Sequence, residues 1–434
     1  MSTFNWQNIW YPCSQMKDYE QFNPLKIHRA SGDYIELENG QKIIDAISSW
    51  WCKSLGHNHP RLKQAIYQQI ERFEHVILAN TQHEVITKLS HTISKLTNHQ
   101  LNRVFYAGDG SSAVEIALKM SLHAQKLKGE NQRTQFIALK NGYHGETTGA
   151  MSVSDVGRFK DPYETMLFKT HFLQNFPYIN GRCDPSWKFN NWEALEIELK
   201  PLINTTAAII IEPMIQGAGG MLIFPPSLLS FLRSWCDQHG VFLIADEIMT
   251  GIGRTGKMLA VDHASITPDF LCLSKGLTSG WMPFSTVSTH DQIYDLFYDD
   301  YAKGKSFLHS HTYSGNALGA SVALACLGII EEENLVVRAE NLENKLQSLM
   351  HEIAFNTKKL TNIRALGAIV AADLLTDRNS ERPAYQIYQK AVEMGALLRP
   401  IGNTLYWLPP LTVANDTLDR LAEITEKAII SHVK

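Results

Sequence analysis

Short apolar runs in the middle of the chain constrain its fold more than any other feature. Four of them read QFIALK, AAIIIE, VFLIADE and FLCLSK, at residues 135–140, 207–212, 241–247 and 270–275. Each run is continuous rather than alternating, which indicates a strand buried on both faces. A further strand is expected at 102–106, and helical stretches such as 113–126 and 226–239 lie between the runs. The pattern predicts an α/β fold with a mainly parallel central sheet flanked by helices.

The last hundred residues follow a different pattern. Residues 334–353 predict a long amphipathic helix, shorter strands are expected near 363–372 and 404–408, and another helix is expected near the end. We therefore expect a second, smaller α+β domain. Residues 171–195 are aromatic, polar and aperiodic, and are predicted to form a long surface loop.

Bulk composition excludes several classes of protein. The 434 residues include 40 basic and 44 acidic side chains, giving a net charge of −4 without a long run of either sign. This balance gives no electrostatic surface for nucleic acid or an anionic membrane. No stretch approaches 18 uninterrupted apolar residues, and the N-terminus lacks the pattern of a signal peptide. Six scattered cysteines without a CxxC pair are typical of reduced thiols, so we expect a cytoplasmic protein.

Two motifs invite interpretations that their context does not support. The pairs His57/His59 and His309/His311 have no third ligand nearby, so no metal site is expected. Residues 251–256, GIGRTG, match the letters of a dinucleotide fingerprint, but the preceding strand ends four residues earlier and no amphipathic helix follows. We therefore predict no dinucleotide site there.

Three predicted strands end in ionisable residues: Glu212, Asp246 and Lys275. Ligands of open α/β sheets bind outside the carboxyl ends of the strands. A buried carboxylate such as Asp246 needs a cationic partner, and a protonated pyridine nitrogen is one such partner. Lys275 would then form a Schiff base to the same ring. Two simpler interpretations stay open at this point: an Asp246–Lys275 ion pair, or a lysine that only marks the strand's end.

The segment GDGSSAVE predicts an anion-binding site. It lies between a predicted strand and a predicted helix, which places the backbone N–H groups of Gly110, Ser111 and Ser112 at a helix N-terminus. Unpaired N–H groups and the helix dipole together attract a phosphate at such a position.

Residues 245–280, ADEIMTGIGRTGKMLAVDHASITPDFLCLSKGLTSG, resemble the signature block of the class III pyridoxal-phosphate aminotransferases. GDGSSAVEIALKM, KNGYHGETTGAMSVS, IIIEPMIQGAGGM and HSHTYSGNALGA also fall in family order, so the resemblance covers essentially the whole chain. It implies fold type I of the pyridoxal-phosphate-dependent transferases and a homodimer with active sites at the subunit interface. It also implies three segments: residues 1–55 joining the small domain, 56–325 forming the large cofactor-binding domain, and 326–434 completing the small domain.

The resemblance assigns cofactor roles position by position. Lys275 would hold the cofactor aldehyde covalently and later move a proton between substrate and cofactor. Asp246 would keep the pyridine nitrogen protonated, and Tyr143 would stack on the ring and share in catalysis. The remaining residues implied to contact pyridoxal phosphate are Gly110, Ser111, Glu212, His311 and Thr312, with Thr312 coming from the other subunit.

Other segments resemble the members of this class that act in biotin synthesis. These are IWYPCSQM near the N-terminus, SSWW at 48–51 and LLRPIGNTLYWLPP at 397–410. They imply transfer of an amino group from S-adenosylmethionine to 8-amino-7-oxononanoate, giving 7,8-diaminononanoate. Arg399 would take the substrate carboxylate in a bidentate pair. The other residues implied to bind substrate are Trp50, Tyr143, Lys275, Ser310 and Tyr406.

Some positions depart from the family pattern. Cys13 stands where a tyrosine is usual, Glu146 replaces a common aspartate, and Ser310, His311 and Thr312 resemble relatives that take lysine as donor. Lysine is therefore an alternative donor, and another ω-amino-acid substrate is an alternative acceptor or donor within the same class. A cofactor-free protein with this fold is disfavoured, because Lys275 and Asp246 are both present.

Overall fold

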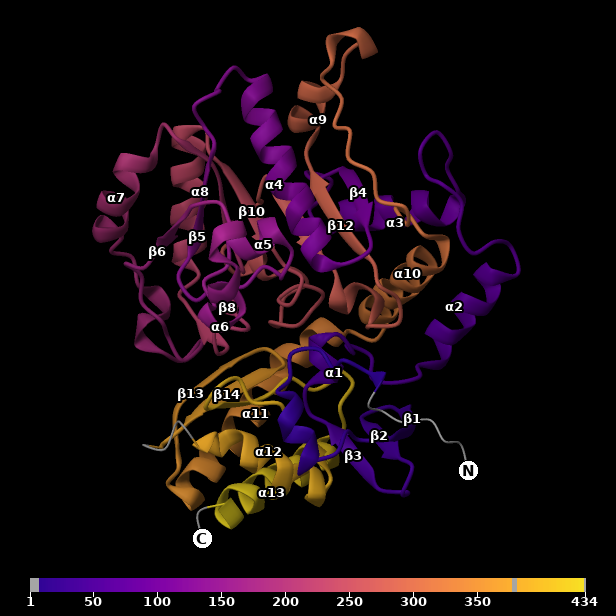
Figure 1. The fold of residues 1–434 in the computed structure, drawn as a ribbon, viewed down its shortest axis with the longest axis vertical. Coiled ribbons are helices and arrows are strands. Elements are labelled where there is room, and N and C mark those ends of the chain that lie inside the picture. The colour runs from indigo at the N-terminus through magenta and orange to yellow at the C-terminus, as the bar shows by residue number, and fades with distance from the viewer. Residues whose placement is uncertain (1–7, 377–380, 433–434) are drawn as a thin grey trace.

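The protein consists of two lobes, a large one above and a smaller one below in Figure 1. The computed structural model describes residues 8–376 and 381–432. The outermost parts of the predicted terminal segments, residues 1–7 and 433–434, lie outside this description. Over the described ranges, no helix is long and apolar enough to cross a membrane.

A seven-stranded sheet forms the centre of the large lobe, in the order β4-β12-β11-β10-β7-β5-β6. Its strands are β4 (Arg103–Ala107), β5 (Gln135–Leu139), β6 (Thr170–Leu173), β7 (Thr206–Ile211), β10 (Phe242–Asp246), β11 (Phe270–Leu273) and β12 (Ser285–Thr289). Only β12 runs against its neighbours, pairing antiparallel with β11 and β4. Every residue of β7, β10 and β11 is buried. The predicted mainly parallel sheet is confirmed, and each of the five predicted strands lies within two residues of its expected ends.

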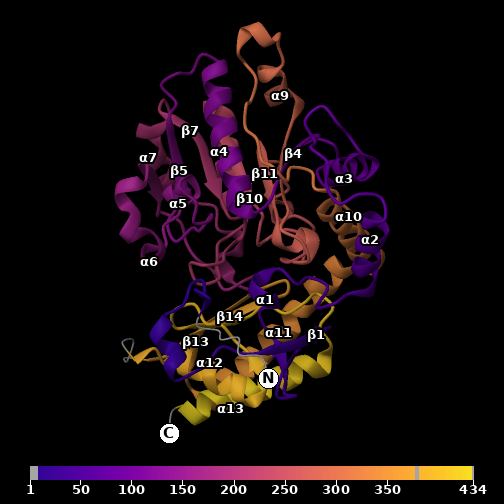
Figure 2. The same ribbon diagram turned by 45° about the vertical axis from the view of Figure 1, so that its right-hand side comes forward.

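Helices cover both faces of this sheet (Figures 1 and 2). The apolar face of α4 (Gly110–Leu127) packs on one side against Ile210 and Ile244. On the other side, α7 (Glu193–Leu199) and α8 (Ser227–His239) pack against Ile209 and Leu243. Successive strand residues thus face opposite cores, which is why these strands read as continuous apolar runs. The remaining helices of this lobe are α2 (Pro60–Ile70), α3 (Glu84–Lys95), α5 (Thr148–Ser152), α6 (Gly157–Lys160), α9 (Asp291–Phe297) and α10 (Ala317–Glu332).

The small lobe is assembled from both ends of the chain. Strands β1 (Ile27–Ser31), β2 (Tyr34–Leu37) and β3 (Lys42–Asp45) form a sheet that is completed by β15 (Ala396–Leu397), parallel to β3. A second sheet contains β13 (Leu360–Leu366), β14 (Ile369–Leu374) and β16 (Thr404–Trp407). Helices α11 (Leu335–Thr357), α12 (Pro383–Met394) and α13 (Asn415–His432) pack with these sheets. We propose the three-segment division as the domain organisation, with the boundary at residue 325 falling inside α10.

Two predictions for the large lobe were wrong or incomplete. The predicted loop at 171–195 contains the end of β6, a bridge between Ile179 and Ile223, and the start of α7. Trp192 within it is only 7% exposed and stacks on Phe231, so aromatic burial replaces the periodic pattern there. Strand β12 was not predicted, because its buried sequence STVST consists mostly of hydroxyl side chains. Residues 251–256 form turns, and the next regular element is the short 3-10 helix Ala260–His263.

Candidate active site

The carboxyl ends of three adjacent strands bring together Glu212, Asp246 and Lys275. Strand β10 lies between β7 and β11 in the sheet, and all three run parallel. The loop after β5 adds Tyr143 and His144, which bond to Glu212 and Asp246 respectively. One end of the sheet therefore holds a lysine, two carboxylates and an imidazole.

Asp246 forms a buried pair with His144. Its Oδ2 lies 2.7 Å from Nδ1 of His144, and its Oδ1 accepts the backbone N–H of Ile248 at 3.1 Å. The two side chains are nearly inaccessible, so the pair is shielded from water. This contact holds the carboxylate of Asp246 in one orientation.

Lys275 does not pair with Asp246, so the ion-pair interpretation is wrong. Among the described residues it has no ion pair, and its Nζ lies 5.2 Å from the centre of the Trp51 ring. Burial lowers the pKa of Lys275, although Asp246 and Glu212 oppose that shift. The neutral amine is favoured by burial, and a neutral amine is the nucleophilic form of lysine.

The Glu212 side chain holds the backbone of Tyr143 in place. The Glu212 carboxylate accepts the backbone N–H groups of Tyr143 and Gly217, each at 2.9 Å. Burial and the nearby charge of Asp246 raise the pKa of Glu212 to about 7. The Tyr143 hydroxyl donates to Oε1 of Glu146 at 3.1 Å, and burial, with Glu146, raises the pKa of Tyr143 above its usual range. Tyr143 is thus held by hydrogen bonds at its backbone N–H and at its hydroxyl, and the ring between them has a defined position.

The N-terminus of α4 lies against this loop. Asp109 caps the helix by accepting the N–H of Ser112 at 2.9 Å, and the N–H groups of Gly110 and Ser111, in the first turn, have no acceptor within the helix. A Cβ on Gly110 would lie 2.9 Å from Cδ1 of Ile248, the residue bonded to Asp246. The anion-binding site predicted from GDGSSAVE therefore lies next to the carboxyl end of β10.

His311 reaches the same helix end from elsewhere in the chain. Its Nε2 lies 3.3 Å from Oγ of Ser112, and its Nδ1 is buried without a hydrogen-bond partner in the part of the chain that the structure describes. An unpaired buried nitrogen is costly unless a ligand satisfies it. Ser310 and Thr312 are exposed, and the Thr312 carbonyl lies 3.0 Å from Nε2 of His75. The contact of Thr312 with a second subunit stays a prediction.

Trp51 of the small lobe lies under Lys275 and contacts a further residue of that lobe. Trp51 donates from Nε1 to the Tyr406 hydroxyl at 2.9 Å, and both side chains are buried. Trp50, 41% exposed, lies under the Arg399 guanidinium at 4.4 Å. Arg399 Nη2 also donates to the backbone carbonyl of Cys13 at 2.8 Å. Three predicted pocket residues thus lie in two contacting pairs: Trp50 with Arg399, and Tyr406 with Trp51, which was not predicted.

Two residues of this site were not singled out from the sequence. His144 lies within the quoted motif KNGYHGETTGA, but its contact with Asp246 joins strands far apart in the chain. A buried carboxylate needing a partner was the available signal, and a nearby histidine satisfies it. Trp51 was passed over for Trp50, and no sequence signal tells which of two adjacent tryptophans turns toward Lys275.

The two HxH pairs have other partners. His57 bonds to Asp45 at 2.8 Å, and His309 lies 2.8 Å from Nζ of Lys119. Within residues 8–376 and 381–432, no group of three or more His, Cys, Asp or Glu side chains is placed to hold a metal ion.

Known proteins resemble this chain over nearly its whole length. The family model "Aminotransferase class-III" matches residues 15–429. A relative from Helicobacter pylori, named adenosylmethionine-8-amino-7-oxononanoate aminotransferase, is 38% identical over 97% of this chain and 95% of its own. The crystal structure of the enzyme of that name from Methanocaldococcus jannaschii superposes with a TM-score of 0.89 at 33% identity, covering 98% of each chain. An amine transaminase from an uncultivated Pseudomonas species, solved in its PLP-bound form, gives a TM-score of 0.89 at 31% identity over 98% of each chain.

Proposed function

The chain belongs to the class-III aminotransferases, and from this we propose that it transfers an amino group from S-adenosylmethionine to 8-amino-7-oxononanoate. The product is 7,8-diaminononanoate, an intermediate on the route to biotin. The enzyme is a transaminase whose cofactor is pyridoxal phosphate. The observation that carries the proposal is the partly buried Lys275, which has no ion pair among the described residues and lies near the Asp246–His144 pair, in a chain 38% identical to a relative of that name.

The residues at the strand ends fit pyridoxal phosphate. Lys275 has a lowered pKa and no ion pair among the described residues, so its amine is available to hold the cofactor. The Gly110 and Ser111 N–H groups and the unpaired His311 Nδ1 suit a phosphate. When bound, the cofactor supplies an electron sink that stabilises negative charge on the substrate carbon.

Side chains of this protein would orient the cofactor ring and transfer protons to and from the substrate. Asp246, oriented by His144, would keep the pyridine nitrogen protonated through a charge-assisted hydrogen bond. Lys275 Nζ would carry the proton between the substrate carbon and the cofactor, as a general base and then a general acid. Tyr143, anchored by Glu212 and Glu146, would cover one face of the ring and exclude water.

The small lobe would bind the substrates. Arg399 presents a planar fork to a carboxylate, and Trp50 beneath it limits the directions that the guanidinium can take. Trp51 and Tyr406 would form the wall opposite the cofactor. Ser310 and His311 are the residues to examine if lysine is the donor.

We further propose that the working enzyme is a cytoplasmic homodimer. Thr312 of one subunit would then complete the phosphate seat of the other. The exposure of Thr312 in the single chain supports this arrangement.

An absorbance experiment tests the function. The purified protein with pyridoxal phosphate should show the visible band of the lysine-bound cofactor, and S-adenosylmethionine alone should bleach it. Addition of 8-amino-7-oxononanoate should restore the band and yield 7,8-diaminononanoate. Lys275→Ala should abolish both steps. Bleaching by lysine alone would change the donor, and an absent band would overturn the whole proposal.

A further inference from the structure

The segment that carries both tryptophans has an unusual backbone. All four residues of α1 (Ser48–Trp51) have positive φ, with values of 50°, 45°, 74° and 73°. None of them is glycine, so each pays the steric cost of the left-handed region. Consecutive residues keep a left-handed conformation only when contacts with the surrounding structure hold them in it. The question is which side chains hold this turn.

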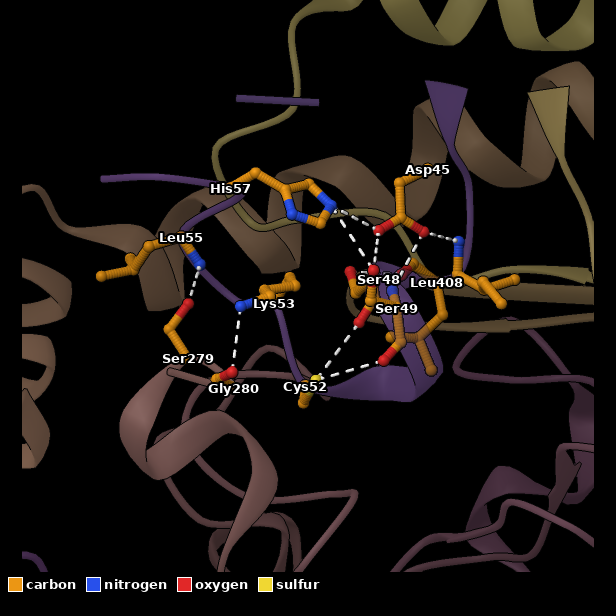
Figure 3. A network of polar contacts seen from close by, with 11 residues as sticks. Asp45, Ser48, Ser49, Cys52, Lys53, Leu55, His57, Ser279, Gly280 and Leu408 are labelled. Atoms are coloured by element: carbon orange, nitrogen blue, oxygen red, sulfur yellow. Dashed lines mark hydrogen bonds and ion pairs between the residues drawn. The ribbon is translucent and has the colours of Figure 1, made fainter. Parts of the chain in front are cut away.

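Asp45, at the end of β3, is the main support (Figure 3). Its carboxylate is fully buried and accepts four hydrogen bonds. Two come from the backbone N–H groups of Ile47 (3.3 Å) and Ser49 (2.9 Å), one from the Ser49 hydroxyl (2.7 Å) and one from Nε2 of His57 (2.8 Å). We call Asp45, Ser49 and His57 the Asp45 network. The Ser48 hydroxyl adds a bond to the Leu408 carbonyl at 2.7 Å.

Asp45 is connected through the fold to both contacting pairs of the proposed pocket, Trp50 with Arg399 and Trp51 with Tyr406. In the parallel pair of β3 and β15, Asp45 is the register partner of Leu397. Two residues beyond Leu397 is Arg399, and five residues beyond Asp45 is Trp50. Those two side chains meet at 4.4 Å. Trp51, on the same turn, reaches Tyr406 and lies beneath Lys275.

We infer that Asp45, Ser49 and His57 are positioning residues that determine where Trp50 and Trp51 stand and thereby align Arg399 with the substrate carboxylate. None of the three is placed on the cofactor or the reacting atoms. Their action passes through the left-handed turn alone. The inference deepens the proposed function and rests on it for the identity of the substrates.

Asp45→Asn tests the network because it keeps the side chain's shape but removes the charge and one acceptor. We expect KM for both carboxylate substrates to rise about tenfold or more, the loss expected for a charge-assisted hydrogen bond. The value of kcat at saturation and the visible cofactor band should stay within twofold of wild type. A simple alkylamine without a carboxylate should bleach the band at the wild-type rate. His57→Ala, which loses one of the four hydrogen bonds to Asp45, should raise KM by an amount between wild type and Asp45→Asn.

Asp33→Asn is the matched control. Asp33 is a neighbouring aspartate in the same lobe, whose carboxylate accepts the Ala414 N–H at 3.2 Å and has no bond to α1. It should lower the melting temperature without changing KM. If Asp45→Asn leaves KM within twofold of wild type, or lowers kcat and alters the cofactor band together, the positioning role is wrong.

Two substitutions at Ser49 test the strained backbone itself. Ser49→Ala and Ser49→Gly both remove the hydroxyl, but only glycine adopts a φ of 45° without steric cost. We expect KM and the melting temperature to change more for alanine than for glycine, with about fivefold between them in KM. Equal effects would overturn the strain argument.

These outcomes are separable from failure of the proposed function. If the wild-type enzyme does not accept 8-amino-7-oxononanoate, the alanine–glycine difference in melting temperature still tests how α1 is held. The KM comparison is then made with whichever carboxylate-bearing amine bleaches the wild-type band.

Discussion

His144 and Asp246 meet at 2.7 Å in a part of the site that water does not reach. Since the second Asp246 oxygen accepts the N–H of Ile248, both oxygens have a defined direction. An aspartate that must hold a ring nitrogen protonated benefits from such orientation, because a wrongly turned carboxylate would lose its hydrogen bond to the ring.

Replacing His144 should therefore impair Asp246 without touching the substrate. We expect His144→Ala to lower kcat by about 10²-fold and to weaken cofactor binding, since the buried carboxylate loses its partner. His144→Gln can still donate a hydrogen bond and should lose less. Steady-state kinetics and titration of the apoenzyme with pyridoxal phosphate measure both effects. Wild-type kinetics for His144→Ala would show that Asp246 needs no orienting partner.

The stacking of Arg399 on Trp50 gives a second prediction. Arg399→Lys keeps the charge but loses the planar fork and much of the contact with the ring. We expect KM for 8-amino-7-oxononanoate to rise about 10- to 100-fold, corresponding to about 1.4–2.7 kcal/mol, with kcat little changed. Lys390→Arg, a reverse exchange on the exposed face of α12, serves as control. An equal loss in kcat would mean that Arg399 acts on the transition state instead.

The partly buried His263 gives a prediction about pH and stability. Burial, with the nearby Arg182 charge, lowers the pKa of His263 to about 4 from an ordinary value of 6.5. The unfolded chain therefore binds a proton that the folded chain does not between these values. Its contribution to stability is full above about pH 6.5 and is lost as the pH falls through the window toward about 4.

His263→Gln should flatten that fall, because glutamine has no proton to gain. Thermal melts at intervals from pH 8 to pH 4 would measure the difference from wild type. His351→Gln, which changes an exposed histidine of α11, should run parallel to wild type. Parallel curves for His263→Gln would contradict the shifted pKa.

Glycine 367 lies in the β13–β14 hairpin and touches the loop after β10. It has a φ of 57°, and a Cβ there would collide with backbone atoms of Arg254, Thr255 and Gly256. Gly367→Ala should destabilise the protein by about 3–4 kcal/mol, combining left-handed strain with overpacking. Gly40→Ala, at a φ of 83° with open space around it, should cost only about 1–2 kcal/mol. Denaturant unfolding measures both, and equal costs would contradict the predicted collision.

The sequence predicted those parts of the structure whose physical signal is local. Continuous apolar runs located β7, β10 and β11, since a strand buried on both faces has few polar residues. Strand β12 escaped because Ser285, Thr286 and Ser288 place hydroxyls in the interior. The ionisable residues at the strand ends were found for the same local reason. His144 and Trp51 were not found, because long-range packing and the backbone handedness of α1 decide where they point.

The pairing of β3 with β15 has a consequence for how the protein is made. Ile44 and Ala396 are register partners, yet a ribosome adding about 5–20 residues per second needs roughly 20–70 s to travel between them. Throughout that time the edge of β3 is exposed and Asp45 lacks the strand beside it, while the large sheet can already form. The nascent chain can thus complete its large sheet well before its small lobe, and the exposed edge of β3 is where we expect chaperones to bind during translation.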